Sequence, residues 1–258
     1  MNKIFFLFAF LSINFSIAQS AIHEVTYFDV PREKAKEFID GFKKIIDFNQ
    51  GKKRTVKSTW LFAHNFGSGF SFMSVDLYEN EEASNSDKAQ EQWRDNLKKL
   101  NEKDRKAFQD FWREFNPLYF NNHTDERRRR PDWKNYFNNL TPEIINNNPI
   151  VVFSSYNPKY SDNREFNNLL REVLVNPTKE RGNAVACFPT SHITGGGTLV
   201  HTFTWYRNWN DFAKEEQIIA KQKMDDKMKR FWEIAGDHSD NIMTLVGTNS
   251  GNDNFYIK

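Results

Sequence analysis

Two stretches of the sequence follow one pattern: WLFAHNFGSGFSFMSV at residues 60–75 and TSHITGGGTLVHTF at residues 190–203. In each stretch a histidine, His64 or His192, stands five residues before the last glycine of a short turn segment. Apolar, aromatic and β-branched residues lie on both sides of that turn, which is typical of a β-hairpin. The sequence therefore predicts two hairpins, and their common spacing indicates an internal repeat.

Two further landmarks recur in the same order after each hairpin. An aromatic pair, Phe111-Trp112 or Phe231-Trp232, ends a long charged stretch, and then comes a His-Ser/Thr-Asp triplet at 123–125 or 238–240. Four landmarks in one order favour two diverged copies of a single unit. We predict repeats at residues 19–125 and 149–258, joined by a linker at 126–148.

Both repeats predict the same order of elements. Strand patterns alternate with period two and helix patterns carry an apolar face. The first repeat predicts strands at 22–30, 55–66 and 70–78, a helix at 33–48 and one or two long helices over 83–115. The second predicts strands at 150–156, 183–193, 198–207 and 242–246, with helices at 164–175 and 210–235.

The predicted order βαββαβ is the split-βαβ, or ferredoxin-like, motif. Its antiparallel sheet carries helices on one face, so the other apolar face must be buried against a partner, and the second repeat supplies one. The fold class predicted is α+β, with two ferredoxin-like repeats packed sheet to sheet. The residues from Glu126 to Pro131 make a poor final strand, so we expect the fourth strand of the first repeat to be displaced, short or missing.

On this element order the chain resembles the tandem dimeric α/β-barrel superfamily, which includes antibiotic-biosynthesis monooxygenases and stress-responsive α/β-barrel proteins. Trp60, Gly67, Gly69 and Trp112, with their counterparts in the second repeat, are the visible marks of the resemblance. It implies a pseudo-dimeric α/β barrel that binds or transforms a small molecule, with oxygenase- or isomerase-type chemistry in some relatives. No catalytic signature of the family is matched.

The amino-acid composition narrows the classes of molecule that this protein is expected to bind. Of 258 residues, 36 are Lys or Arg and 34 are Asp or Glu, so no nucleic-acid partner is expected. A single cysteine excludes an intrachain disulfide framework and a site built from several cysteines. Residues 1–18 have a basic start, an apolar run and small residues before a cut after Ala18, which predicts a signal peptide. We therefore expect an exported protein, periplasmic or secreted, with no membrane span after cleavage.

The linker contains asparagine clusters and two prolines, Pro131 and Pro142, and Pro117 and Pro149 flank it. Within it, Trp133, Tyr136 and Phe137 predict one short helical turn. Four arginines, 127–130, stand at its start. Because guanidinium groups pair bidentately with anions, Arg128 and Arg129 are candidate ligand-binding residues. The alternative is a solvated stretch balanced by neighbouring carboxylates.

Histidines of the repeated positions form a candidate metal site. If edges of the two sheets meet, His64 could approach His238 and His192 could approach His123, with aspartates nearby. The candidate ligands are His64, His238, His192, His123, Asp125 and Asp240, a set that suits zinc or iron. The alternative is local structure, since these residue types cap helices and form turns. No cofactor is required by the sequence.

Aromatic side chains form a second candidate site. Phe203 and Trp205 share one strand face and Tyr206 takes the other, so Trp205 with Trp60 could stack on a ligand or simply pack in the core. The function predicted is an exported protein that binds or transforms a small molecule. Alternatives are a non-enzymatic envelope interaction module, and haem or metal binding. Fusion of two units favours a monomer with an internal pseudo-twofold.

Overall fold

The computed structural model describes residues 20–67, 69–130, 136–251 and 253–258. The predicted signal peptide and Trp133 lie outside the described residues. The strands are β1 (Ile22–Phe28), β2 (Ser58–Phe66), β3 (Phe72–Tyr78), β4 (His123–Arg129), β5 (Phe137–Asn138), β6 (Ile150–Asn157), β7 (Ala184–Gly195), β8 (Val200–Tyr206), β9 (Asp237–Thr248) and β10 (Tyr256–Ile257). The helices are α1 (Ala35–Phe48), α2 (Glu81–Ser86), α3 (Ala89–Lys99), α4 (Glu102–Phe120), α5 (Pro142–Asn146), α6 (Asn163–Leu169), α7 (Asn176–Arg181), α8 (Trp209–Ile219) and α9 (Asp226–Ile234).

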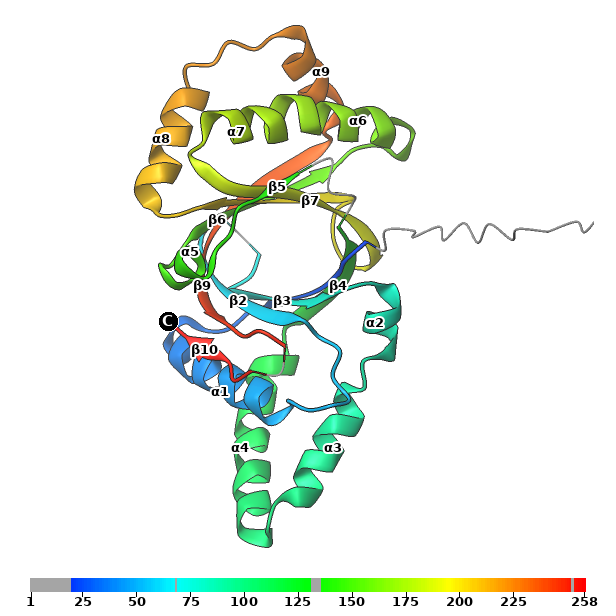
Figure 1. Cartoon of the computed structure of the whole chain (residues 1–258), viewed down its shortest axis with the longest axis vertical. Helices are drawn as coiled ribbons and strands as arrows, with labels where there is room; N and C mark the ends of the chain where they lie inside the picture. Colours follow the sequence, from blue (N-terminus) through cyan, green and yellow to red (C-terminus); the bar gives the residue numbers. More distant parts are fainter. Residues whose placement is uncertain (1–19, 68, 131–135, 252) are drawn as a thin grey trace, which may run out of the picture.

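Eight strands close into an antiparallel barrel, which Figure 1 shows from one end. Their order is β9-β2-β3-β1-β4-β7-β8-β6, and β6 pairs with β9 to complete the circle. Each half of the chain contributes four neighbouring strands in the same order: second, third, first, fourth. The predicted α+β class with an antiparallel sheet is confirmed. The two halves meet edge to edge, β2 on β9 and β4 on β7.

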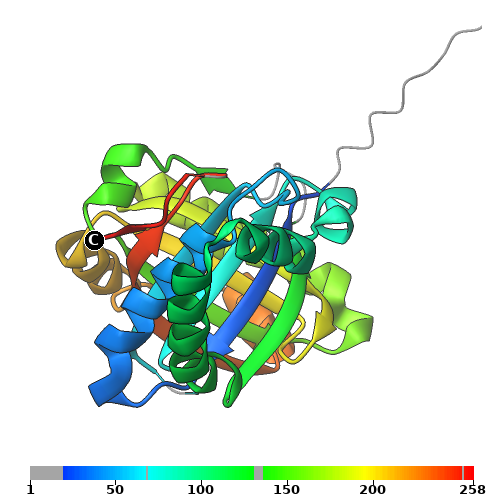
Figure 2. The ribbon, with the colours of Figure 1, turned by 90° about the horizontal axis from the view of Figure 1, so that it is seen from below.

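Helices cover the outside of the barrel on two opposite sides. The helices α1, α3 and α4 lie on one side and α6 to α9 on the other (Figure 1). Seen from below, α1 and α4 lie over the strands of the first half (Figure 2). The apolar face of α1, with Phe38 and Phe42, packs on Phe28 and Phe72 from the outer face of that sheet. This apolar stripe is what the spacing in the sequence predicted.

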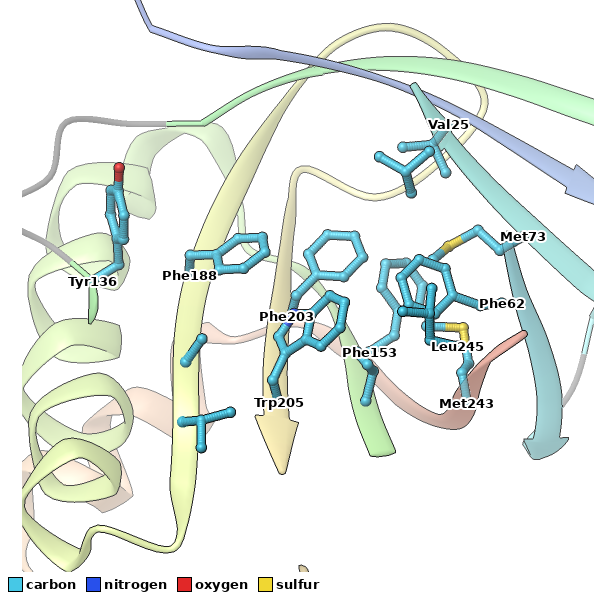
Figure 3. Packing of buried hydrophobic residues seen from close by; sticks show 14 residues of the cluster. Val25, Phe62, Met73, Tyr136, Phe153, Phe188, Phe203, Trp205, Met243 and Leu245 are labelled. Carbon is cyan, nitrogen blue, oxygen red and sulfur yellow. The ribbon is translucent and has the colours of Figure 1, made fainter. Parts of the chain in front are cut away.

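Apolar side chains from alternate positions fill the barrel interior (Figure 3). Phe203 and Trp205 of β8 point inward with Phe62, Phe153 and others, whereas Tyr206 packs on the outer side. The predicted division of this aromatic run between two faces is confirmed. It follows from the two-residue period of a strand.

The expectation that the fourth strand of the first half is displaced, short or missing is wrong. The strand β4 has seven residues and pairs along its whole length with β1, so residues 126–129 belong to the barrel and not to a linker. Its charged sequence misled the prediction. Glu126 and Arg128 point into the barrel and neutralise each other there, with Nη1 to Oε2 at 2.6 Å. Alternation then leaves Arg127 and Arg129 on the outer face.

The connection between the halves differs from the predicted helical turn. Phe137 belongs to β5, which pairs with Cys187 and Ala186 of β7, and Tyr136 packs with the barrel interior. The helical turn comes later, at α5, where the Thr141 side chain accepts a hydrogen bond from the Ile144 amide. No helix among the described residues has the length and apolarity needed to span a membrane.

Replacing Arg128 tests the buried pair on which β4 depends. Arg128→Met leaves Glu126 as a buried charge without its partner, so we expect the free energy of unfolding to fall by about 3–5 kcal/mol. The matched control is Arg129→Met, which breaks only the exposed pair with Glu81 and should cost less than about 1 kcal/mol. Urea unfolding followed by circular dichroism measures both, and equal losses would contradict the assignment.

Candidate functional site

A cavity of about 360 Å³ lies in the second half, between the outer face of the sheet and the helices. Strands β6, β8 and β9 provide its floor, while α7, α8, α9 and the segments around them provide its walls. Most of the lining is apolar, including Val152, Leu174, Ile219, Met224, Met228 and Phe231. The polar lining residues relevant to chemistry are Tyr156, Arg181, Glu216, Trp232, His238 and Asp240.

A wide helical turn shapes one wall. Residues 170–175 between α6 and α7 form a π-helix, and Val173 and Leu174 of this segment line the cavity. Pro177 follows directly, has no amide hydrogen to give to Val173, and would clash with its carbonyl in a regular helix. The wider turn relieves this conflict, and such π segments are frequent at functional sites.

The opposite wall is made by two helices that replace the single helix predicted over 210–235. Residues 220–225 interrupt it, and Asp225 caps the new start by accepting from the Met228 amide. Gly236 then turns the chain from α9 into β9 with a φ of 68°. A Cβ there would lie 2.1 Å from the Asn157 carbonyl oxygen, so only glycine fits. This turn places His238 at the cavity.

His238 and Asp240 form a hydrogen-bonded dyad in the cavity wall. The histidine Nε2 lies 3.2 Å from Asp240 Oδ1. The imidazole stacks on Tyr156 at 4.8 Å and meets the Trp232 ring edge-on at 5.0 Å. Burial raises the pKa of Asp240, but hydrogen bonds from His238 and Ser154 outweigh this and hold it below its ordinary value.

The first half carries an equivalent dyad in another setting. His123 Nε2 lies 3.1 Å from Asp125 Oδ2, and Thr26 donates to the same carboxylate at 2.7 Å. The register of β4 on β1 matches that of β9 on β6, with Asp125 opposite Thr26 and Asp240 opposite Ser154. A cavity of about 450 Å³ lies beside Asp125 and Thr26, but His123 is not among its lining residues.

Inside the barrel, a polar cluster surrounds the buried Glu126 and Arg128. Arg128 donates to Glu126, to the hydroxyl and carbonyl of Thr190, and to the carbonyls of Thr198 and Leu199. Glu126 also accepts from the Tyr27 hydroxyl. All five guanidinium hydrogens therefore have acceptors, so Arg128 is a structural residue and not an accessible anion site. Arg129 pairs with Glu81 on the surface at 2.9 Å.

Two histidines lie next to this cluster as neutral groups. Burial lowers the pKa of His23 to about 3, and the charges of Arg130 and Arg128 act in the same direction. Burial and the Arg128 charge hold the pKa of His201 well below its ordinary value. Neither ring nitrogen of His23 has a hydrogen-bond partner among the described residues.

The predicted tryptophan pair exists, and it lies in the barrel core. Trp60 and Trp205 meet edge to face with ring centroids 5.3 Å apart. Trp205 is fully buried, and its Nε1 has no partner in the described part of the chain. The pair packs against Phe62 and does not line any of the cavities described above.

The predicted histidine pairs are separated by strand register. Sheet edges do meet as expected, but His64 lies opposite Met243, five positions from His238, and His192 lies opposite Arg128, five positions from His123. Five residues of strand span roughly 16 Å, which is too far for one metal ion. Among the described residues, no three His, Cys, Asp or Glu side chains are arranged to hold a metal.

The sequence predicted a metal site shared by His238, Asp240 and His64, which strand register keeps apart. The other residues that line the cavity were not predicted. No sequence motif included Tyr156, Arg181 or Glu216. Trp232 stood in the repeated Phe-Trp pair, which served only as a landmark. The available signal was the position of this pair seven residues before the histidine triplet, across a glycine.

Comparison with known proteins gives a likeness of fold. No family model matches the sequence, and no curated protein matches it. A candidate monooxygenase from Fusobacterium nucleatum is 12% identical, with a TM-score of 0.59 over 93% of this chain and 99% of that one. An anthrone oxidase-like protein is 11% identical, with a TM-score of 0.59 over 92% and 95%. A candidate monooxygenase from Lactobacillus acidophilus is 9% identical, with a TM-score of 0.54 over 93% and 100%.

The neutral buried histidines predict a loss of stability in mild acid. A histidine in the unfolded chain takes up a proton below pH 6.5, while His23 in the folded barrel stays neutral to about pH 3. Its contribution to stability is therefore full above pH 6.5 and falls as the pH drops toward 3, by about 2 kcal/mol at pH 5. His23→Phe should flatten the decline between pH 7 and pH 5 in urea unfolding. Parallel curves for the two proteins would contradict the assignment.

Proposed function

We propose that this protein binds a small, largely apolar molecule in the second-half cavity. The observation that carries the proposal is the cavity itself: apolar walls with a few polar side chains that converge on one edge. Its volume of about 360 Å³ falls in the range of small-molecule sites. The packed barrel interior leaves the space between sheet and helices as the place for a ligand.

The fold neighbours support a role in small-molecule chemistry by analogy. Two of them are candidate monooxygenases and a third is anthrone oxidase-like. Analogy of fold does not fix a reaction, so it adds to the cavity argument without replacing it. We also propose kinship with the tandem dimeric α/β-barrel superfamily, with each half a ferredoxin-like repeat. The common strand order and the matching register of the two dyads support this proposal.

We propose further that the mature protein is an exported monomer. A barrel closed within one chain leaves none of its eight strands with a free edge, which removes one reason to dimerise. Export rests on the sequence of residues 1–18 alone. Sequencing the N-terminus of protein recovered outside the cytoplasm tests cleavage after Ala18.

One surface feature favours the alternative of an interaction module. Phe66 and Trp209, from different halves, meet edge to face at 6.0 Å, with 62% and 45% of their surfaces exposed. Exposed aromatic pairs of this kind occur at protein contacts. Phe66→Ser with Trp209→Ser would abolish such a contact and leave ligand binding in the cavity intact.

A cavity-filling substitution tests the main proposal. Val152→Phe adds a ring to the cavity floor and should weaken binding of the neutral fluorescent apolar probe N-phenyl-1-naphthylamine at least tenfold. The matched control, Val246→Phe, adds the same ring to the outer face of the barrel against the first-half helices, where Val246 packs. It should leave the affinity unchanged. Fluorescence titration measures both, with circular dichroism to show that each variant is folded, and equal affinities would refute the site.

A further inference from the structure

We propose that His238 is a catalytic base, positioned by Asp240, which removes a proton from a weakly acidic C–H or O–H group of a neutral aromatic substrate. This inference rests on the proposed function, because the substrate must occupy the second-half cavity. The inference assigns proton abstraction to one edge of that cavity, and it assigns a class of substrate to the cavity as a whole.

The first support is the geometry of the imidazole. Its Nε2 faces Asp240 Oδ1 at 3.2 Å, and its Nδ1 has no hydrogen-bond partner among the described residues. A base needs one nitrogen held and the other free to accept a proton. The rings of Tyr156 and Trp232 hold the imidazole on two sides, so its orientation is fixed before a ligand arrives.

The second support is the electrostatics of the carboxylate. Asp240 remains ionised beside the imidazole, since hydrogen bonds from His238 and Ser154 lower its pKa by more than partial desolvation raises it. A carboxylate in this place stabilises the imidazolium that forms when the proton arrives. Asp240 is therefore a positioning residue that acts through His238.

The remaining charges select a neutral substrate. The Arg181 guanidinium, which lines the cavity, is already paired with the buried Glu215 at 2.6 Å. Glu216 and Asp240 line the same cavity, and burial together with Asp240 raises the pKa of Glu216. An anion entering this space would meet two carboxylates, and the described lining residues include no unpaired Lys or Arg to offset them. A neutral acid with aromatic character matches the aromatic and methionine lining.

The first half provides a natural comparison. His123 has the same relation to Asp125, but its Nδ1 contacts the Phe120 carbonyl oxygen at 2.9 Å. Its two ring nitrogens are thus both engaged, and it does not line the first-half cavity. The same side-chain pair therefore occurs once with a free nitrogen at a cavity and once without.

A reaction that consists of one proton abstraction tests the proposal without knowledge of the natural substrate. The probe is 5-nitrobenzisoxazole, a small, neutral, aromatic carbon acid. His238 Nδ1 takes the proton from carbon 3, the C–H electron pair becomes the third bond of a nitrile, and the ring N–O bond breaks. The oxygen leaves with the electron pair of the broken N–O bond as a coloured phenolate, so no oxidant or other reactant is needed.

We expect the protein to accelerate this reaction with saturation in probe concentration. His238→Ala should lower kcat/KM at least tenfold, and added imidazole should restore part of the rate by occupying the vacated space. His123→Ala is the matched control and should leave the rate unchanged. Asp240→Asn should lower kcat with little change in KM, and Asp240→Glu should recover part of kcat, which a purely structural role would not produce.

The outcomes separate the inference from the function on which it rests. If the apolar fluorescent probe binds in a Val152-dependent manner but His238→Ala retains the full elimination rate, the base assignment is overturned and the binding site stands. Equal losses in the His238 and His123 variants would overturn it as well. If neither probe binds in a Val152-dependent manner, both proposals fall together.

Discussion

The buried pair of Glu126 and Arg128 is the constraint on which the barrel depends. The strand β4 joins the two halves, pairing with β1 on one side and β7 on the other, and it must carry these charges into an apolar interior. Arg128 offsets this cost by giving its five hydrogens to Glu126, Thr190 and the β7–β8 hairpin. The hairpin can approach because Gly197 has no side chain: a Cβ there would lie 2.3 Å from Glu126 Oε2. The glycine run between β7 and β8 therefore permits both the hairpin turn and the close contact of this hairpin with β4.

Closing the barrel determines where a ligand can bind. Packed rings occupy the interior, and the two cavities described above lie where a helix layer stands off the outer face of the sheet. The halves differ in how they build that layer. The second half has the π segment before Pro177 and the break between α8 and α9, which together leave room above Tyr156. The first half leaves its space beside charged side chains of β1, β3 and β4.

Local patterns predicted most of the elements, because strand alternation and helix stripes are properties of short segments. The hairpins, α1 and the division of Phe203 and Trp205 from Tyr206 all followed from periodicity. The strand β4 did not, since nothing local shows that Arg128 finds Thr190 62 residues away. The interruption at 220–225 was equally hidden, because its lysines and Asp225 fit a helix surface until the chain folds back over the sheet. Tertiary contacts decided these cases.

The histidine triplets show how a shared sequence pattern can suggest partners that strand register keeps apart. Their equivalence is real in register: each aspartate lies opposite the hydroxyl residue of the neighbouring first strand. The hypothesis of shared metal ligands required each triplet to approach a hairpin histidine across the strand pairs that join the halves, β2 with β9 and β4 with β7. Strand register places them five positions apart, and His64 stacks on Phe70 at the barrel end while His238 stacks on Tyr156 beneath α9. A motif present in both halves therefore reflects the geometry of its own sheet. The surroundings of the two imidazoles differ: His123 Nδ1 contacts the Phe120 carbonyl oxygen, whereas His238 lines a cavity beneath the second helix layer.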